Sequence, residues 1–197
     1  MFKIKLLPDF KKNDTKSKNN ICISIEQDKN MSTLLHKKNI PQDIKVAVIS
    51  VSTTRNLSND KSGIWIKKQA KKEGHEVIIH QVVTDDVDAI SDLTRHVTEK
   101  ICPDAIIMTG GTGLSPRDVT IEAIKPMFKK ELTAFGVLFA QLSFDEIDSA
   151  AILSRATAGV IGSTIIFCMP GSIKACKLAC KNLIFPELGH ILKHIKE

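Results

Sequence analysis

Residues 104–120 read Asp-Ala-Ile-Ile-Met-Thr-Gly-Gly-Thr-Gly-Leu-Ser-Pro-Arg-Asp-Val-Thr, and this stretch carries the pattern from which the fold is inferred. The apolar run over 104–109 predicts a buried strand. Apolar residues at helical spacing follow from Val119, so we expect a helix over 120–130. The stretch is therefore a strand, a glycine-rich loop and a helix in succession.

The same alternation of strand and helix runs through the chain from residue 44. Because strands that are apolar throughout are covered by helices on both faces, the pattern predicts an α/β fold with three layers and a doubly wound, mostly parallel sheet. Pro186 is expected to break the chain before a last helix that ends at Ile195. The other expected strands cover 44–51, 76–83 and 164–169, and the other expected helices cover 63–72, 87–101, 135–142 and 173–184.

Four segments of this pattern follow the carboxyl ends of predicted strands. They are residues 50–63, 83–88, 109–118 and 169–172. Ligands of open parallel sheets bind outside the carboxyl ends of the strands. We therefore expect these four segments to converge on one site.

Three glycines, Gly110, Gly111 and Gly113, determine the chemistry of the loop after residue 109. Glycine permits positive φ and close approach of a ligand, and free loop N–H groups favour an anion. The glycine spacings of P-loops and of dinucleotide-binding loops are both absent. The glycine loop could be either a tight strand-to-helix turn or a cradle for phosphate. Its place between a strand and a helix, with Arg117 nearby, favours the phosphate cradle.

Carboxylates stand beside two of the four segments. Asp118 either caps the amide of Thr120 or Ile121, or contributes a carboxylate to a metal site. Asp85 and Asp86 either open the next helix or hold Mg²⁺ against a triphosphate, and the sequence does not choose between these roles. If the loops bind phosphates, in-line transfer without a covalent intermediate is the economical mechanism.

Other polar residues have structural interpretations. Asp60 is interpreted as a helix cap, and Arg155 as one half of a surface ion pair. The six histidines are scattered and none is assigned a catalytic role, and no nucleophile elbow is present. The five cysteines form no Cys-x-x-Cys pair, so they are expected to be buried, reduced thiols.

Length and composition favour a single folded domain with a separate basic extension. The chain has 197 residues with 43% hydrophobic and 25% charged residues, which is typical of a soluble globular protein. Residues 1–40 hold nine lysines against four acidic residues, so most of the net charge of +6 lies there. We expect a disordered extension over 1–40 and a domain over 41–197, a cytoplasmic location, and no nucleic-acid or membrane partner.

Several motifs together resemble a known family, the MoaB and MogA proteins of molybdenum cofactor biosynthesis. The resemblance covers about residues 42–197, and the ending Phe-Pro-Glu-Leu-Gly-His-Ile-Leu-Lys-His at 185–194 is similar to MoaB. The motifs that carry it are Asp-Lys-Ser-Gly at 60–63, the glycine loop and the helix after it at 108–124, Leu-Ser-Phe-Asp-Glu-Ile at 142–147, Ile-Leu-Ser-Arg-Ala-Thr-Ala-Gly at 152–159 and Met-Pro-Gly-Ser at 169–172.

The resemblance implies a molybdopterin-binding fold and a Mg²⁺-dependent adenylation of molybdopterin by ATP that releases pyrophosphate. It also implies a homo-oligomer, trimeric or hexameric, and contact with other proteins of the same biosynthesis. Asp85, with Asp86 as the adjacent possibility, and Asp118 would be the catalytic carboxylates and would hold Mg²⁺. The residues implied to bind phosphate, nucleotide or pterin are Asp60, Ser62, Thr109, Gly110, Gly111, Thr112, Gly113, Arg117, Ser154, Arg155, Pro170, Gly171 and Ser172.

The chain departs from the family's pattern in one place. Val137 and Ala140 stand where the family usually has a glutamate and a basic residue. This departure motivates an alternative, a catalytically silent MoaB paralogue that binds molybdopterin or a partner without turnover. A third possibility is a different nucleotide-dependent transferase on the same sheet.

Overall fold

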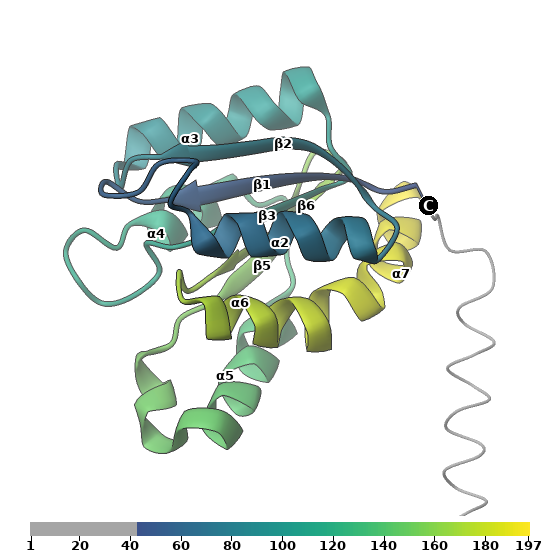
Figure 1. The fold of residues 1–197 in the computed structure, drawn as a ribbon. Coiled ribbons are helices and arrows are strands. Elements are labelled where there is room, and N and C mark those ends of the chain that lie inside the picture. Colours follow the sequence, from purple (N-terminus) through teal and green to yellow (C-terminus); the bar gives the residue numbers. More distant parts are fainter. Residues whose placement is uncertain (1–42) are drawn as a thin grey trace, which may run out of the picture. The chain divides into compact units, whose positions relative to one another are not determined.

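The computed structural model describes residues 43–197, so the predicted extension over residues 1–40 lies outside the described part. The predicted three-layer α/β fold is confirmed: one sheet of six strands, in the order β2-β1-β3-β6-β5-β4, has helices on both faces (Figure 1). The strands are β1 (Lys45–Val51), β2 (Glu76–Val83), β3 (Ala105–Thr109), β4 (Lys130–Glu131), β5 (Thr157–Ile161) and β6 (Thr164–Met169).

Four of the strands, β2, β1, β3 and β6, are neighbours and run parallel. Their carboxyl ends are level, because the register pairs Ser50 with Thr109, Thr109 with Met169, and Val51 with Val83. The four loops that follow these strands therefore start side by side at one edge of the sheet.

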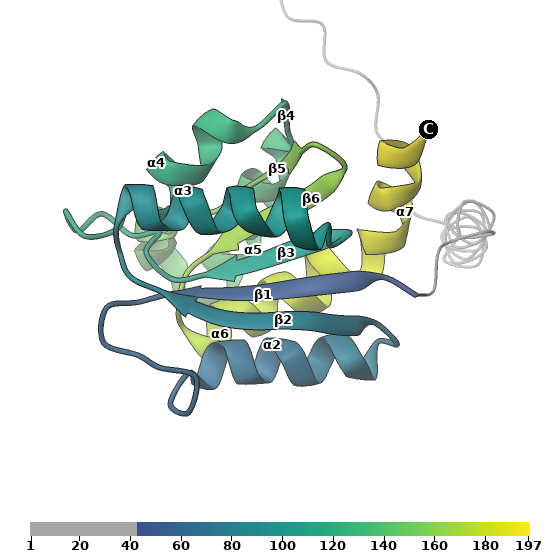
Figure 2. The same ribbon diagram turned by 90° about the horizontal axis from the view of Figure 1, so that it is seen from above.

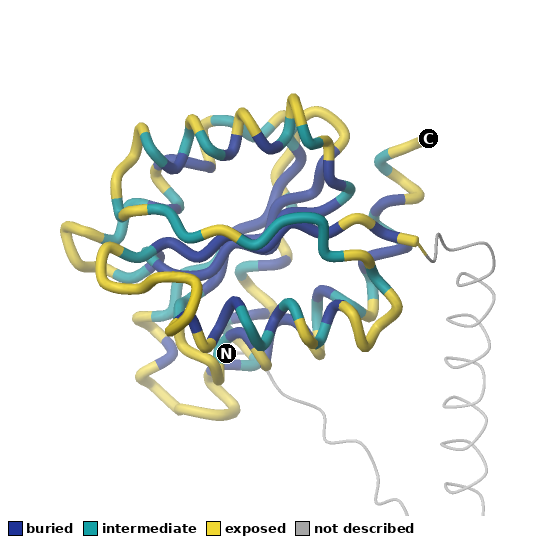
Figure 3. The backbone as a smooth tube through the Cα atoms, turned by 45° about the horizontal axis from the view of Figure 1, so that its top comes forward, coloured by how far each residue is buried: buried dark blue, intermediate teal, exposed yellow. Residues whose placement is uncertain are grey.

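Two apolar cores, one on each face of the sheet, hold the layers together. One face packs against α2 (Lys61–Lys72), α5 (Thr133–Ile147), α6 (Ile173–Ala179) and α7 (Phe185–Lys196). The other face packs against α3 (Val87–His96) and α4 (Thr120–Ile124), as the view from above shows (Figure 2). The central strands β1, β3 and β6 are buried except at Lys45, whereas the loops at their carboxyl ends are mostly exposed (Figure 3).

β4 and β5 are absent from the sequence prediction, and both pairings of β5 are antiparallel. A two-residue turn at Gly162 and Ser163 joins β5 to β6, and Gly162 has a φ of +59°. The apolar run of β5 is short and is interrupted by Gly159, which weakens the strand signal. The position of Gly159 lies against the ring of Phe128, so a side chain there would collide with that ring.

The helix predicted over 120–130 is much shorter in the structure. α4 ends at Ile124, and one 3₁₀ turn, Lys125–Met127, follows it. Pro126 lacks the N–H that the next helical hydrogen bond needs, and the chain becomes extended at Phe128. The site therefore cannot depend on a long helix at this position.

Pro186 does not break the last helices, contrary to the prediction. α6 continues through a π-helical turn, Cys180–Ile184, directly into α7, and the proline lies in the first turn of α7. A proline is tolerated at that position because a first-turn N–H needs no helical partner. α5 is also longer than predicted: it reaches Ile147 and is followed by the 3₁₀ segment Asp148–Leu153.

The cysteine prediction is right for three residues and wrong for one. Cys168, Cys176 and Cys180 are buried free thiols, whereas Cys102 is exposed. Cys102 follows the π-helical turn Val97–Ile101 in a left-handed position with φ of 52°, where its thiol donates to the carbonyl of Glu99 rather than packing in the core. Cys22 lies outside the described residues. None of the helices within residues 43–197 is long and apolar enough to span a membrane.

Candidate active site

The four segments predicted to converge lie together at the carboxyl edge of the parallel strands. The loop after β1 reaches the loop after β6, because Arg55 Nη1 and Ser62 Oγ both donate to the carbonyl of Gly171, at 3.3 and 2.9 Å. The loop after β3 reaches β6 through Gly110 N, which donates to the carbonyl of Met169 at 3.0 Å. These contacts make the edge one continuous site.

The glycine loop depends on glycine at its points of closest approach. Gly110 and Gly111 have positive φ values of 103° and 61°. A Cβ on Gly110 would overlap the carbonyl oxygen of Val51, and a Cβ on Gly171 would lie 3.2 Å from Gly110 Cα. Side chains at these positions would therefore push the loops after β1, β3 and β6 apart.

The glycine loop presents an unused set of hydrogen-bond donors. Within the described chain, the backbone amides of residues 111–114 donate to no protein group. The Oγ1 of Thr112 is buried and has no hydrogen-bond partner within residues 43–197. Consecutive unpaired N–H groups and a buried hydroxyl suit an anion such as a phosphate, which would supply the missing acceptors.

The structure gives the two adjacent aspartates after β2 different contacts. Asp86 caps α3, because its Oδ1 accepts a hydrogen bond from the Ala89 amide at 2.8 Å. Asp85 Oδ2 instead accepts from both the amide and the hydroxyl of Thr53, each at 2.6 Å. Asp85 also faces the glycine loop, since its Oδ1 lies 3.4 Å from the Cβ position of Gly111. Asp85 is therefore the carboxylate that faces the site.

Asp118 caps neither Thr120 nor Ile121, contrary to one of its two interpretations. The residue before α4 is Val119, and no side chain caps that helix. Asp118 Oδ2 accepts from the Ser115 amide at 3.0 Å and lies 2.8 Å from the Cβ position of Gly113. It therefore closes the turn after the glycine loop and turns toward the loop.

Asp85 and Asp118 thus flank the glycine loop from two sides. No cluster of three or more His, Cys, Asp or Glu side chains suited to a metal ion exists between residues 43 and 197. Mg²⁺ is typically held by one or two carboxylates together with the phosphates of a substrate, and it needs no such cluster. The donor set fits Mg²⁺ bound in that way.

Arg155 supports the glycine loop and also forms the predicted ion pair. Its Nη2 lies 2.7 Å from Glu122 Oε1, and its Nε donates to the carbonyl of Thr112 at 2.9 Å. Ser154 is half-buried directly before it, and the exposed Arg117 side chain has no ion-pair partner within the described chain. The guanidinium of Arg117 is therefore free to meet a ligand.

The loop after β6 is fixed mainly through its backbone. The carbonyl of Pro170 accepts from Thr109 Oγ1 at 3.0 Å and from the Cys176 thiol at 3.5 Å. Ser172 caps α6 by accepting from the Ala175 amide at 3.1 Å. These bonds fix the position of the loop relative to the glycine loop.

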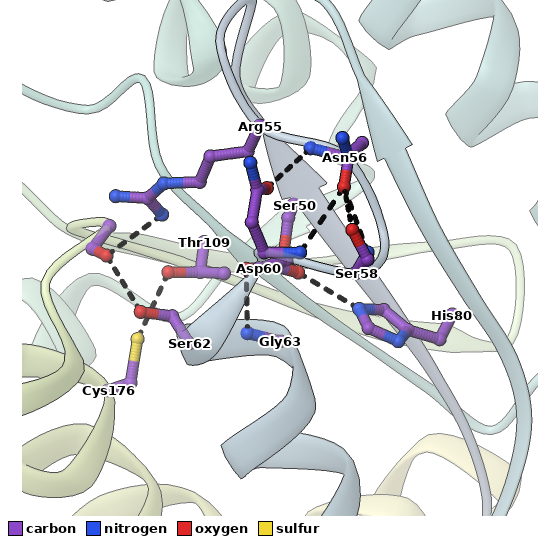
Figure 4. A network of polar contacts seen from close by, with 12 residues as sticks. Ser50, Arg55, Asn56, Ser58, Asp60, Ser62, Gly63, His80, Thr109 and Cys176 are labelled. Atoms are coloured by element: carbon purple, nitrogen blue, oxygen red, sulfur yellow. Dashed lines mark hydrogen bonds and ion pairs between the residues drawn. The ribbon is translucent and has the colours of Figure 1, made fainter.

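A buried polar cluster lies beneath the loop after β1 (Figure 4). Asp60 caps α2, as predicted, through the Gly63 amide at 3.0 Å. Its Oδ2 also accepts from Ser50 Oγ at 2.5 Å and contacts His80 Nε2 at 2.9 Å. Burial raises the pKa of Asp60, but the hydrogen bonds from Ser50, Gly63 and His80 outweigh it, so that the pKa lies below its usual value.

The cluster of Ser50, Asp60 and His80 is not a nucleophilic triad. The aspartate lies between the other two side chains, so the histidine cannot take a proton from the serine. Sequence reasoning missed His80 because it considered only histidines in the loops, and His80 lies within β2. It also did not single out Thr53 or Arg55, although both belong to the segment expected at the site.

A pocket of about 540 Å³ opens between the loop after β1 and the end of β2. Thr53, Arg55, Gln81 and Thr84 are among the residues that line it. Its volume lies within the range of small-molecule sites. The pocket leaves room for part of a substrate beside the loop that carries Asp85.

The two positions that depart from the family pattern lie on α5. Val137 is 70% exposed, and Ala140 is half-buried one turn further along the helix. Neither side chain makes a polar contact with the four loops. Val137 belongs instead to an exposed apolar surface, here called the α5 surface, whose other members are Leu138, Phe144, Ile147, Ile152 and Leu153.

Comparisons with known proteins agree with this geometry. Residues 47–190 match the family described as "Probable molybdopterin binding domain". The chain is 46% identical to "Molybdenum cofactor biosynthesis protein B" of Bacillus subtilis (strain 168), over 85% of this chain and 99% of that protein. It is 38% identical to "Probable molybdopterin adenylyltransferase" of Methanocaldococcus jannaschii, over 83% and 99%. A crystal structure of "Molybdenum cofactor biosynthesis protein B" is 40% identical, with a TM-score of 0.77 over 79% and 98%.

Proposed function

This chain belongs to the MoaB-like family of molybdopterin-binding proteins of molybdenum cofactor biosynthesis, and we propose that it adenylates molybdopterin. A terminal phosphate oxygen of the pterin attacks the α-phosphorus of ATP and forms a new P–O bond. The bond from that phosphorus to the oxygen that bridges to the β-phosphate breaks, and pyrophosphate leaves with the electron pair. The name of the Methanocaldococcus jannaschii relative, an adenylyltransferase, supports this reaction.

The observation that carries the proposal is the set of unused donors between two fixed carboxylates. Within residues 43–197, the amides of residues 111–114 and the buried Thr112 hydroxyl have no protein hydrogen-bond partner. Donors that are already in place stabilise charge on a phosphoryl group in the transition state without reorganising. Asp85 and Asp118 stand on either side of that loop.

Each carboxylate is held by a neighbour, so its position is set before substrate binds. Thr53 fixes Asp85 through two hydrogen bonds, and the Ser115 amide fixes Asp118. These two aspartates are the residues that would hold Mg²⁺, which when bound neutralises charge on the phosphates. In the alternative role, they orient the attacking phosphate.

Residues on both sides of the glycine loop bind the two substrates in this proposal. The Arg117 guanidinium pairs with phosphate oxygens, and Arg155 keeps the loop in place through Thr112. Ser154, Gly171 and Ser172 line the neighbouring surface for pterin and nucleotide. Holding both reactants in line supplies a large part of the rate enhancement.

We also propose that the protein works as a homo-oligomer through the α5 surface. Ile152 is 86% exposed in the single chain, and the α5 surface contains five further large apolar side chains that are exposed. An exposed apolar patch of this kind marks an interaction surface. Val137, which stands where the family usually has a glutamate, adds to its apolar character. A sedimentation experiment that returned the mass of one chain would contradict this assembly.

A pterin-binding protein without turnover is the alternative, and Val137 and Ala140 are the residues that favour it. They remove a carboxylate and a cation that the family usually has. If those two charges pair with each other, their joint loss is nearly neutral for the site. Within the described residues, neither side chain makes a polar contact with the glycine loop or the two carboxylates, which favours the active enzyme.

The experiment uses purified protein, molybdopterin, Mg²⁺ and ATP labelled in the α-phosphate. The expected result is label on the pterin and release of unlabelled pyrophosphate, both dependent on Mg²⁺. Measurable pterin binding without labelled product would identify a silent paralogue instead. Equal transfer to other phosphorylated acceptors added in competition would identify a different transferase.

A further inference from the structure

The loop after β1 is exposed, yet it carries two contacts that shape the site. Residues 53–59 are all exposed, and Thr53 and Arg55 reach Asp85 and Gly171 from this loop. Its own bonds are short-range: the amides of residues 54 and 55 donate to Ser52 Oγ, and Asn56 and Asn59 bond to each other. The start of the loop is held on the sheet, because the Ser52 amide donates to the carbonyl of Val83 at 2.8 Å. The bonds within the loop fix its shape but not the position of its far end.

Asp60 is the buried residue that attaches the end of this loop to the sheet. It is fully buried, and it contacts Ser50 on β1 and His80 on β2 through the same oxygen atom. Two neighbouring strands therefore fix one carboxylate, and the helix that starts beyond it carries Ser62 to the carbonyl of Gly171.

His80 is packed specifically for this contact. It lies within β2 on the face covered by α2, and its side chain is only 7% exposed. Gly63 lies directly against the cluster: a Cβ there would overlap both Asp60 and His80 and would lie 2.8 Å from Ser50 Oγ. The first turn of α2 thus leaves space for the histidine ring and for nothing larger.

The chemistry of the contact assigns the proton to His80 Nε2. The pKa of Asp60 lies below its usual value, so its carboxylate is charged at neutral pH and can only accept. His80 Nε2 must then donate, in the neutral ring as well as in the cation. The charged groups that face the ring are Asp60 on one side and, in a pocket of about 540 Å³, Lys67, Lys68 and Lys71 on the other.

We propose that His80 is a positioning residue of the active site, which acts by holding Asp60 and with it residues 52–63. The inference rests on the proposed adenylyl transfer for its effect on turnover, but not for its effect on the loop. Without the donor from β2, Asp60 keeps only Ser50 and Gly63 as partners. The segment then shifts, Thr53 loses its alignment with Asp85, and Arg55 and Ser62 lose theirs with Gly171.

The test compares His80→Leu, which removes the donor, with His80→Gln, whose amide nitrogen occupies nearly the same place as Nε2. His96→Leu, an exposed histidine on α3, is the matched control. Hydrogen exchange of peptides from residues 52–63 reports the loop, and adenylyl transfer reports kcat and KM for ATP.

We expect His80→Leu to speed exchange of this segment at least about tenfold and to lower kcat about 10–100-fold, as loss of a supporting partner does, with a smaller change in KM. His80→Gln should bring exchange and kcat most of the way back to their wild-type values, and His96→Leu should change neither. Wild-type exchange and kcat in His80→Leu, or a His80→Gln variant as defective as His80→Leu, would overturn the proposal.

The role of His80 can still be tested if the wild type is inactive or if His80→Leu does not fold, because exchange and chemical shifts need no activity. If the wild type transfers no adenylyl group, the proposed function fails, and exchange in the three variants alone decides the role of His80. If His80→Leu does not fold, the nitrogen chemical shifts of His80 in the wild type decide it. A neutral ring protonated on Nε2 supports the proposal, and one protonated on Nδ1 overturns it.

Discussion

Asp85 accepts two hydrogen bonds from Thr53, one from its amide and one from its hydroxyl, each at 2.6 Å. The pair joins the loop after β1 to the loop after β2. These bonds also distinguish Asp85 from Asp86, whose carboxylate instead caps α3. Two chemically identical neighbours thus have different roles, and each role can be tested by the same substitution.

Asp85→Asn should abolish turnover, whereas Asp86→Asn should not. An asparagine at 85 can still accept from Thr53, so the loop keeps its place, but the negative charge at the site is lost. We expect adenylyl transfer to fall at least about 100-fold, the size of effect seen when one electrostatic group is removed from a transition state. Asp86→Asn should retain turnover and lose at most about 1 kcal/mol of stability. The reverse ranking of the two variants in a transfer assay would contradict the assignment.

Gly63→Ala should destabilise the protein, although alanine normally favours a helix over glycine. The added Cβ would overlap Asp60 and His80, so we expect a loss of about 1–3 kcal/mol in the free energy of unfolding. Gly74→Ala is the control: φ is +87° and nothing lies near its Cβ position, so it should cost about 1–2 kcal/mol through backbone strain alone. Urea unfolding measures both, and only Gly63→Ala should also lower turnover. A more stable Gly63→Ala variant would contradict the packing described for this cluster.

Asp60 should contribute stability that is lost in acid. Its pKa in the folded protein lies below the unfolded value of about 3.9, so the charged form stabilises the fold above that pH. The contribution declines as the pH falls through about 4 and toward the lower folded pKa. The difference in unfolding free energy between wild type and Asp60→Asn should therefore narrow between about pH 5 and pH 3. A difference that widens over this range would show that the folded pKa is raised instead.

Thiol labelling should separate the four described cysteines into two groups. Burial raises the pKa of Cys168 to about 12, and it also raises the pKa values of Cys176 and Cys180. Because the thiolate is the reactive form, these three should resist alkylation in the folded protein at pH 7.5. Exposed Cys102 should react quickly, and all four should react in denaturant. Rapid native labelling of Cys176, read by peptide mass spectrometry, would mean that the core beneath the site opens readily.

Sequence reasoning recovered the parts of the fold that depend on strong local patterns. β2 (Glu76–Val83) and β6 (Thr164–Met169) have the predicted bounds, because β6 is apolar from Ile165 onward and β2 has two short apolar runs, on either side of His80 and Gln81. β5 was missed, although the two-residue turn at Gly162 was a usable hairpin signal. The continuous helix through Pro186 could not be predicted, because the π-helical turn before it has no sequence signature of its own.

The candidate site was predictable in outline and not in its contacts. Level strand ends place the four loops together, which topology alone implies. The choice between Asp85 and Asp86 depends on which carboxylate meets the Ala89 amide, and that is a matter of backbone geometry. The role of His80 could not be predicted, because it depends on the register of β2 against β1, which a single sequence does not reveal.

The most direct test of the account is transfer of α-labelled phosphate from ATP to molybdopterin by the wild type and by Asp118→Asn. The asparagine can still accept from the Ser115 amide, so the loop and the melting temperature should be preserved while transfer falls at least about 100-fold. Asp92→Asn, an exposed carboxylate on α3, should transfer label at the wild-type rate. Labelled pterin from the wild type and not from Asp118→Asn is the predicted result. Equal labelling by both proteins, or no labelling by the wild type, would contradict the proposed enzyme.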